Sequence, residues 1–455
     1  MIPTNLSAEL SEHARRMEQL SALALTELKS AKVDDAKVVA SFSQTQKVII
    51  ENKEFTLAQT IGSENLSIAA YKNRKKGSSS INATEDTAIK KAVNDAVSLT
   101  EFGVEDEYLC VARLEKAPPA KMLEFLFDDQ VANLKMETLA EVAGLSLDIL
   151  GRDARLAIDR CEFTSNISYS SFHNTQGVMQ QEIQTQVGWT FFGMARDGEE
   201  VTGFDYDGGA SFRWDGVQKS VTDLAENFAE KLLKGLKPVA CTSYRGAVLF
   251  SPRAVEEILL PFIFFHASGN SIMDGKSRWG KDLGGVVANR ALTITDNPYA
   301  PYLAGASAFD RDGIPTREQK IIENGVLKSF LFDCYSAKKL GKESNAFAGG
   351  PFGIHMSPGK DQLSSILNAQ PNLLVVDRFS GNSDPIKGDM SGVAKSSRLF
   401  VQGRDAGAVT ETMIAGNLFE MLMAISMVSQ ETTVVSSEGV FPYVLIDGVS
   451  VTGNS

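Results

Sequence analysis

A histidine at the end of an apolar helix is the side chain in this sequence best placed to do chemistry. His266, one of four histidines, closes the apolar run from Ile258 to Phe265 and is followed by small and polar residues. An imidazole changes its charge near neutral pH, so it can act as a general base or as a metal ligand. A polar group at the mouth of a buried helix is either part of a site or a satisfied core residue, and the residue types alone leave both interpretations open.

Other catalytic and binding motifs are incomplete. The G-x-S-x-G turn of serine hydrolases is absent, and the 57 acidic residues give no basis for choosing a catalytic carboxylate pair. The segment Gly392–Ser397 resembles a Walker motif but lacks its first glycine and the adjacent glycine and lysine. The acidic stretch 196–209 lacks the spacing of a calcium loop, so we interpret it as a plain loop. His173 falls at a predicted hairpin tip, where we expect it to be exposed.

Composition excludes several classes of protein. The 455 residues carry a net charge of −12, which offers no basic field for nucleic-acid phosphates. The four cysteines lie far apart without a C-x-x-C pair, which favours buried thiols in a reducing compartment, the cytoplasm. The N-terminus has no apolar signal segment, and no apolar run approaches the roughly 20 residues of a membrane span. We therefore expect a cytoplasmic protein that contacts neither nucleic acid nor membrane.

The sequence of the first half of the chain predicts helices and antiparallel strands. Apolar residues at helical spacing predict a long amphipathic helix over 7–31 and another helix over 136–150. Alternating segments predict strands over 37–43, 47–55, 66–72 and 78–81, and a hairpin over 155–192. A helix beginning at Thr222 and ending at Gly235 precedes Pro238, where we place a domain boundary.

The second half is dominated by strands around one buried helix. Ser251 and Pro252 form a helix start, and the helix they open is predicted to run to His266. A hairpin is predicted over 316–332 with its turn at Asn324–Gly325, further strands over 373–379, 397–402 and 440–446, and a short helix over 417–427. The predicted fold is α+β with two domains: residues 1–237 form helices with antiparallel strands, and residues 238–455 form a β-rich domain around the buried helix.

Several segments resemble the TldD/PmbA metallopeptidase family, also called putative modulators of DNA gyrase. The helix ending in His266 resembles the position of the family's H-E-x-x-x-H zinc motif. Other matching segments span nearly the whole chain: 62–96, 165–177, the acidic turn 309–316, the hairpin 321–327, 412–419 and 445–449. The resemblance implies a peptidase fold and a function in proteolysis of peptides or unfolded polypeptides.

The sequence departs from the family pattern where the zinc would bind. In the register of the motif, His266 matches the first ligand, but Ala267 replaces the glutamate base and Ser271 replaces the second histidine. A catalytic zinc needs about three protein ligands and an open position. The family's further thiolate ligand also has no counterpart among the last hundred residues, and Cys334 is interpreted as a core residue. This pattern is similar to the PmbA/TldE branch, whose members lack the motif and pair with a zinc-bearing TldD-type subunit.

The resemblance therefore implies a non-catalytic PmbA/TldE-like subunit without catalytic, cofactor or metal residues of its own. Zinc would lie in a TldD-like partner, as a heterodimer, and peptide would be the substrate. With its co-ligands replaced, His266 is better interpreted as a structural histidine. Two alternatives stay open: a stand-alone hydrolase built from His266, His355 and a carboxylate, and a homodimeric peptide-binding protein.

Overall fold

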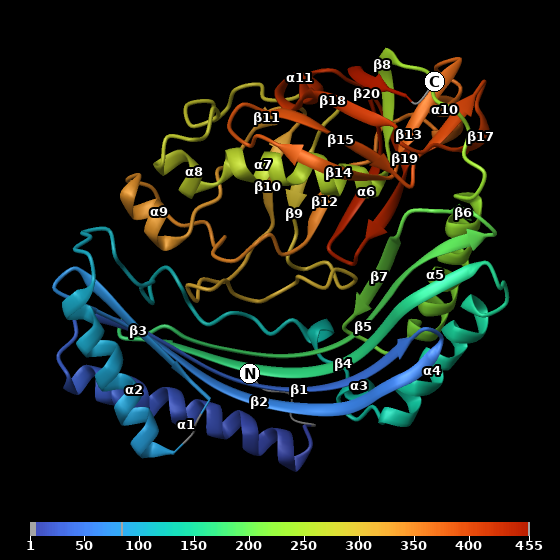
Figure 1. Cartoon of the computed structure of the whole chain (residues 1–455). Coiled ribbons are helices and arrows are strands. Elements are labelled where there is room, and N and C mark those ends of the chain that lie inside the picture. Colours follow the sequence, from blue (N-terminus) through green and yellow to red (C-terminus); the bar gives the residue numbers. More distant parts are fainter. Residues whose placement is uncertain (1–5, 83–84, 454–455) are drawn as a thin grey trace.

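The computed structural model describes residues 6–82 and 85–453 and contains two antiparallel-rich sheets (Figure 1). Within these residues the first sheet has seven strands and the second has thirteen. Helices pack against both sheets, so the predicted α+β class is confirmed. None of the described helices is long and apolar enough to cross a membrane.

The first sheet is built from four very long strands that curve beneath the second half of the chain (Figure 1). Its order is β3-β2-β1-β4-β5-β6, with β7 pairing β5. β1, β4 and β5 alternate buried and less buried residues over much of their length, because successive side chains point to opposite faces of the sheet. The strands are β1 (Asp35–Glu51), β2 (Glu54–Lys72), β3 (Lys75–Ile81), β4 (Leu156–Asn174), β5 (Met179–Asp197), β6 (Glu200–Val201) and β7 (Asp205–Ser211).

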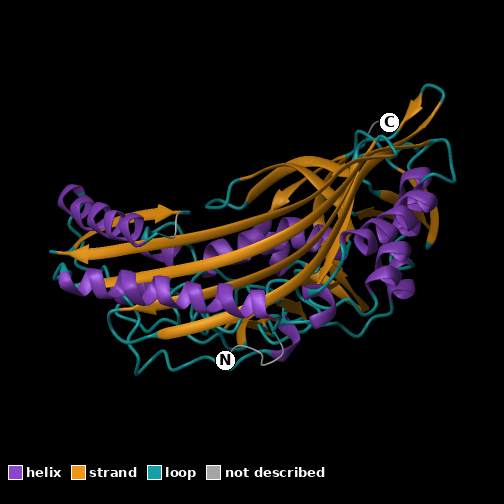
Figure 2. Cartoon of the chain, turned by 90° about the horizontal axis from the view of Figure 1, so that it is seen from below, coloured by secondary structure: helices purple, strands orange, loops and turns teal. Residues whose placement is uncertain are grey.

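Two groups of helices cover the outer face of this sheet (Figure 2). α1 (Ala8–Ser30) and α2 (Asp86–Leu99) pack over one end, and α4 (Met136–Leu150) and α5 (Val217–Lys234) over the other. Their inward stripes, such as Ala14, Met17 and Leu28 on α1, recur at helical spacing and are fully buried. The short helix α3 (Asp129–Ala132) precedes α4, and single 3₁₀ turns lie at Thr100–Phe102 and Glu124–Leu126.

The second sheet wraps around the central buried helix. Its main path runs β11-β10-β9-β12-β20-β8-β13-β16-β17, and β14, β15, β18 and β19 join it from the side. The strands are β8 (Tyr244–Phe250), β9 (Ile294–Asp296), β10 (Gln319–Glu323), β11 (Val326–Leu327), β12 (Ile354–Met356), β13 (Asn372–Val376), β14 (Arg378–Ser383), β15 (Asp389–Lys395), β16 (Arg398–Val401), β17 (Arg404–Ala408), β18 (Met413–Asn417), β19 (Ile425–Val435) and β20 (Gly439–Thr452). The helices outside the centre are α8 (Gly269–Met273), α9 (Cys334–Lys339), α10 (Leu363–Leu367) and α11 (Leu418–Met423).

The central helix begins and ends where the sequence predicts, but it is not uniform. It comprises α6 (Pro252–Ala254), a π-helical turn (Val255–Leu259) and α7 (Leu260–Ala267). The Ser251 side chain caps it by accepting a hydrogen bond from the Ala254 amide at 3.2 Å. Pro261 has no amide hydrogen to donate to the carbonyl four residues earlier, and the π turn lies directly before it. The helix contributes most of its residues to the largest apolar core of the chain.

The acidic turn 309–316 joins the two sheets. Lys37 on β1 forms an ion pair with Asp312 at 3.1 Å. Gly313, with a positive φ of 81°, lies against the Phe172 ring of β4. Asp310 accepts hydrogen bonds from the amides of Asp312 and Ile314, and its burial, followed by the charge of Asp312, raises the pKa of Asp310 to about 7. The turn is therefore a structural clamp between the sheets.

Glu182 on β5 makes a second connection between the sheets. Its carboxylate accepts hydrogen bonds from the Ala308 amide at 2.5 Å and from the Ser307 hydroxyl at 2.9 Å. Burial raises the pKa of Glu182 to about 7, although these donors favour the ionised form. The loop that leads into the acidic turn is thus anchored to the first sheet at a buried carboxyl group.

Several predicted boundaries were wrong for identifiable reasons. β1 and β2 run unbroken through residues 44–46 and the mostly polar residues 56–65, because pairing with a long neighbour holds polar residues in a strand. His173 lies inside β4 and is 4% exposed rather than at an exposed tip, since the turn falls two residues later. The helix predicted over 417–427 ends at Met423, and the rest begins β19. The boundary at 237/238 stays a prediction; it falls between the end of α5 and the start of β8.

Candidate functional site

The end of α7 encloses His266 in aromatic side chains. The ring of His266 has no exposed surface, and its centroid lies 4.6 Å from Phe262, 4.8 Å from Phe419 and 5.4 Å from Trp279. Phe265 contacts it edge-on at 5.1 Å. The imidazole is therefore packed as a core group.

Only one nitrogen of this ring has a hydrogen-bond partner among the described residues. Nδ1 accepts a hydrogen bond from the Arg278 amide at 3.2 Å, whereas Nε2 is buried without a partner in hydrogen-bonding geometry. Burial lowers the pKa of His266 to about 4, although the nearby Pro385 carbonyl favours the protonated ring and so raises the pKa. His266 is thus neutral at physiological pH and holds the loop after α8 in place.

The residues at this position do not fit a zinc ion. Ala267 is fully buried without a carboxylate, and Ser271 is 8% exposed and offers a hydroxyl where an imidazole would be needed. Cys334 starts α9, and burial raises the pKa of its thiol well above the usual range. Among the residues that the structure describes, no group of three His, Cys, Asp or Glu side chains has the arrangement of a metal site.

The alternative constellation of His266 with His355 is not assembled. His355 lies on β12, opposite Thr295 of β9 and Val440 of β20. No ring contact or hydrogen bond within residues 6–82 and 85–453 joins it to His266, whose contacts are the aromatic side chains and the Arg278 amide.

Replacing His266 with leucine is expected to change the pH dependence of stability. In the wild type the native pKa lies near 4, below the value of about 6.5 for an unfolded histidine, so the unfolded state takes up the proton first. The contribution of His266 is therefore full above pH ~6.5 and is lost as the pH falls towards ~4, by up to about 3 kcal/mol. Urea denaturation across this range should show the stability difference between wild type and His266→Leu narrowing as the pH falls. Parallel curves would contradict a buried neutral imidazole.

A cavity of about 550 Å³ lies along the same helix. Its walls are mainly apolar, and its polar residues gather around the guanidinium of Arg378 and the carboxylate of Glu257. Pro385, whose carbonyl acts on the His266 ring, also lines it. The apolar lining consists of Ile258, Pro261, Phe262, Phe265, Phe379 and Met390. This arrangement can accept an apolar side chain next to a polar backbone.

A buried ionic cluster around Asp205 joins the start of β7 to the central helix and to β14. Asp205 is 2% exposed and pairs with Arg378 at 3.0 Å, Lys231 at 3.0 Å and Arg253 at 3.5 Å. Its second oxygen accepts a hydrogen bond from the Ser396 hydroxyl at 2.7 Å. Burial alone would raise the pKa of Asp205, but Lys231, Ser396 and Arg253 hold it below its ordinary value. The carboxylate is therefore ionised and satisfied.

The two arginines of this cluster also enclose an aromatic ring. The guanidinium groups of Arg253 and Arg378 lie 4.4 Å and 4.0 Å from the centroid of the Tyr206 ring. Glu257 pairs with both arginines at 3.4–3.5 Å and accepts a hydrogen bond from the Phe379 amide at 3.0 Å. This group separates the cavity along the helix from a second cavity on the other side of Asp205.

Sequence reasoning missed this cluster because Asp205 lies in the stretch interpreted as a plain acidic loop. One signal was available: Arg253 and Glu257 stand four residues apart on a buried helix, where unpaired charges are not tolerated. That spacing predicts that further charged side chains pair with these two residues, but it does not indicate that one of them lies on the first sheet.

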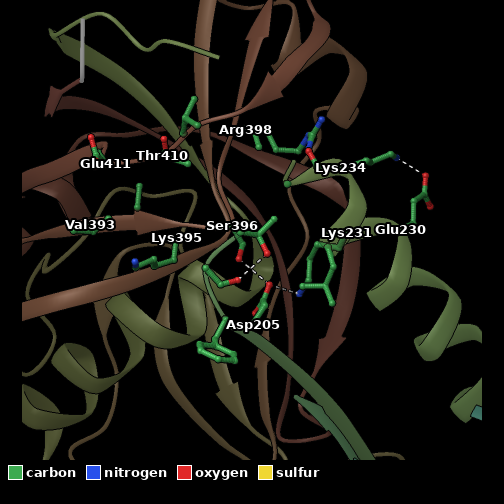
Figure 3. Close-up of a pocket in the computed structure, with 18 of the residues that line it drawn as sticks. Asp205, Glu230, Lys231, Lys234, Val393, Lys395, Ser396, Arg398, Thr410 and Glu411 are labelled. Carbon is green, nitrogen blue, oxygen red and sulfur yellow. Dashed lines mark hydrogen bonds and ion pairs between the residues drawn. The ribbon is translucent and has the colours of Figure 1, made fainter. Parts of the chain in front are cut away.

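The second cavity, of about 440 Å³, lies where α5 faces β15, β16 and β17 (Figure 3). Asp205, Lys231 and Ser396 meet at the centre of its wall, and Lys234 with Glu230 lies to one side (Figure 3). Both sheets thus contribute side chains to one hollow, and the charged groups on α5 are already paired with acids.

Comparison with known proteins supports the family resemblance. The PmbA/TldA metallopeptidase C-terminal domain matches residues 243–453, which contain the central helix and the whole second sheet. A metalloprotease PmbA homolog of Haemophilus influenzae is 27% identical over 93% of this chain and 92% of its own length. Residues 243–453 therefore belong to the PmbA/TldA metallopeptidase C-terminal domain family, and the chain as a whole is similar to PmbA.

Further similar proteins match the chain over nearly its full length, and two solved structures share its fold. The metalloprotease PmbA of Escherichia coli O157:H7 is 25% identical over 93% of each chain. The crystal structure of TldE from Thermococcus kodakarensis superposes with a TM-score of 0.82 at 21% identity, covering 96% of this chain and 100% of TldE. A Bacteroides thetaiotaomicron protein solved as a proposed modulator of DNA gyrase gives a TM-score of 0.85 at 20% identity, covering 96% of this chain and 98% of that one. The family resemblance inferred from the motifs is thereby confirmed.

Proposed function

We propose that this chain is a PmbA/TldE-like subunit of a TldD/TldE-type metalloprotease and does not hold the catalytic zinc itself. The observation that carries the proposal is the burial of His266 among aromatic rings, with Ala267 and Ser271 at the positions of the missing base and second ligand. In this proposal a TldD-type partner holds zinc, and the pair cleaves peptides or unfolded polypeptides in the cytoplasm.

The contribution of this subunit would be to bind extended polypeptide. The cavity along the central helix offers an apolar pocket for a substrate side chain, close to the position where the family carries its chemistry. An open sheet edge offers backbone pairing, because residues 54–65 of β2 have only β1 as a neighbour among the described strands.

This edge lacks several of the features that usually prevent strand addition. It contains no proline, lysine or arginine, and three large apolar side chains along it are exposed. They are Phe55 at 52%, Leu57 at 36% and Ile61 at 48%. An edge of this kind supports the addition of a peptide strand, or of a strand from another subunit.

Separate chelation of the two subunits tests the proposal. This chain and a TldD-type protein from the same cell would each be treated with chelator, desalted and mixed with the untreated partner, and cleavage of an unfolded polypeptide would be followed. We expect full activity when this chain is the treated subunit and none when the partner is.

The same experiment separates the alternatives. Cleavage by this chain alone would contradict the proposal and favour a stand-alone hydrolase. Failure to associate with a TldD-type protein, together with self-association and retention of peptide, would contradict the subunit role and favour a homodimeric peptide-binding protein.

A further inference from the structure

Both apolar and charged side chains line the cavity between α5 and the strands of the second sheet, and we call the apolar ones its floor and the charged ones its rim. Figure 3 shows the labelled charged residues on both sides of it. Its volume of about 440 Å³ lies within the range of roughly 300–1,000 Å³ typical of small-molecule sites. Phe204, Leu232, Val393, Ala394, Ala408 and Val409 supply the apolar lining. Phe204 is 52% exposed and stacks on Phe192 with a centroid distance of 5.0 Å, so a rigid aromatic face is open at this hollow.

Most charges on the rim neutralise one another. Lys231 pairs with Asp205 and Asp207, Lys234 pairs with Glu230, and Arg398 pairs with Asp405 at 2.7 Å. A ligand charge would have to break one of these pairs in order to use it. These groups therefore shape the cavity without offering it a free charge.

Two rim residues are exceptions. Lys395 and Glu411 line the cavity, yet neither side chain forms an ion pair or a hydrogen bond with any residue in the part of the chain that the structure describes. Both lie on the side of the cavity opposite Lys231 and Lys234 (Figure 3). The rim thus presents one unmatched cation and one unmatched anion.

Backbone pairing brings the main chains of these two residues to the same end of one strand pair. Val393 on β15 pairs with Met413 on β18, and the Ala394 amide donates to the Thr412 carbonyl at 2.8 Å. Lys395 and Glu411 are the next residues after Ala394 and before Thr412, so they lie at the same end of the β15–β18 pair. Glu411 has a positive φ of 51°, outside the conformation of a regular strand, and the two charges remain more than 4.0 Å apart.

We propose that this cavity binds a short peptide with free termini, its carboxylate at Lys395, its ammonium at Glu411 and an apolar side chain on the floor. The charges of a free amino acid sit on a single Cα, whereas those of a dipeptide sit on consecutive Cα atoms about 3.8 Å apart. A dipeptide therefore suits Lys395 and Glu411, which come from two separate segments of the chain and do not pair with each other. Because both sheets line the cavity, its occupant would bridge them. This site is distinct from the cavity along the central helix and does not rest on the proposed function.

Calorimetric titration with alanyl-leucine and its blocked derivatives tests the site on the full chain. The unblocked dipeptide should bind, and acetylating its amine or amidating its carboxylate should each weaken binding about fivefold, the value of one exposed charge pair. Free leucine should bind more weakly than the dipeptide.

Matched variants link each terminus to its residue. Glu411→Gln should weaken the unblocked dipeptide about fivefold but should not weaken the acetylated form further, and Lys395→Gln should behave likewise towards the amidated form. Lys360→Gln, which removes an exposed lysine remote from the cavity, should leave every affinity unchanged. Three results would each overturn the assignment. In the first, the dipeptide would not bind, and in the second, the doubly blocked dipeptide would bind as tightly as the unblocked one. In the third, a variant would weaken the correspondingly blocked dipeptide by the same further factor as it weakens the unblocked one.

Discussion

Replacing Asp205 with alanine is expected to lower the free energy of unfolding by about 3–5 kcal/mol. Asp205 is 2% exposed, and its carboxylate is the shared partner of Arg253, Arg378 and Lys231. Removing it takes the nearest carboxylate from Arg378 and Lys231 and leaves Glu257 as the paired acid of both largely buried arginines, which is a costly way to break a buried cluster. Urea denaturation of the two proteins at neutral pH measures the loss.

Asp207 supplies a matched control for this variant. It lies two residues further along β7 and shares Lys231, at 3.5 Å, but its side chain is 33% exposed. Asp207→Ala should therefore cost less than about 1 kcal/mol. Similar losses for the two alanine variants would show that burial of the Asp205 cluster does not hold the two sheets together.

Gly313→Ala is expected to lower the free energy of unfolding by about 2–4 kcal/mol. Gly313 has a φ of 81°, which an alanine adopts only with strain. A Cβ atom there would lie 2.5 Å from Cε1 of Phe172, so either the acidic turn or the β4 ring would have to move. Because this turn clamps the second sheet to the first, the loss should appear as reduced cooperativity between the two sheets as well as reduced stability.

Gly198→Ala separates the two causes of this loss. Gly198 also has a positive φ, of 63°, but a Cβ atom there would meet nothing within 4 Å. That variant should show only the backbone strain, about 1 kcal/mol. If Gly313→Ala and Gly198→Ala are equally destabilised, the contact with Phe172 contributes nothing and the clamp is wrongly assigned.

Local sequence patterns were sufficient for the elements that depend on local physics. The central helix begins at Ser251 and Pro252 as its capping residues predict, α4 spans the predicted 136–150, and the turn at Asn324–Gly325 has both residues at positive φ. Each feature is decided by a cap, an apolar period or a turn residue within a few positions.

Elements that depend on distant partners were not predictable in this way. The polar middle of β1 is held extended by β2 on one side and β4 on the other, and neither neighbour is visible in a local window. Asp205 looks like any acidic loop residue until the fold brings Arg253 and Arg378 to it. His266 was placed correctly at the end of the helix, but only the structure shows the aromatic side chains that enclose it.

In the proposed function, the end of α7 and the polypeptide-binding surfaces have different roles. The end of α7 keeps the position of a zinc motif, but its imidazole is a packing group. In that function, the cavity along the helix and the open edge of β2 would be the surfaces that bind polypeptide. In the proposed complex, binding and catalysis would therefore belong to different subunits.

Metal analysis of the purified chain tests this division most directly. The chain would be incubated with excess zinc, desalted and examined by inductively coupled plasma mass spectrometry, alongside His266→Leu. We predict far less than one equivalent of zinc in both proteins, because His266 has no co-ligands among residues 6–82 and 85–453 and its partnerless Nε2 is buried. One equivalent of zinc in the wild type that is lost in His266→Leu would contradict the account, since it would place a zinc centre in this subunit.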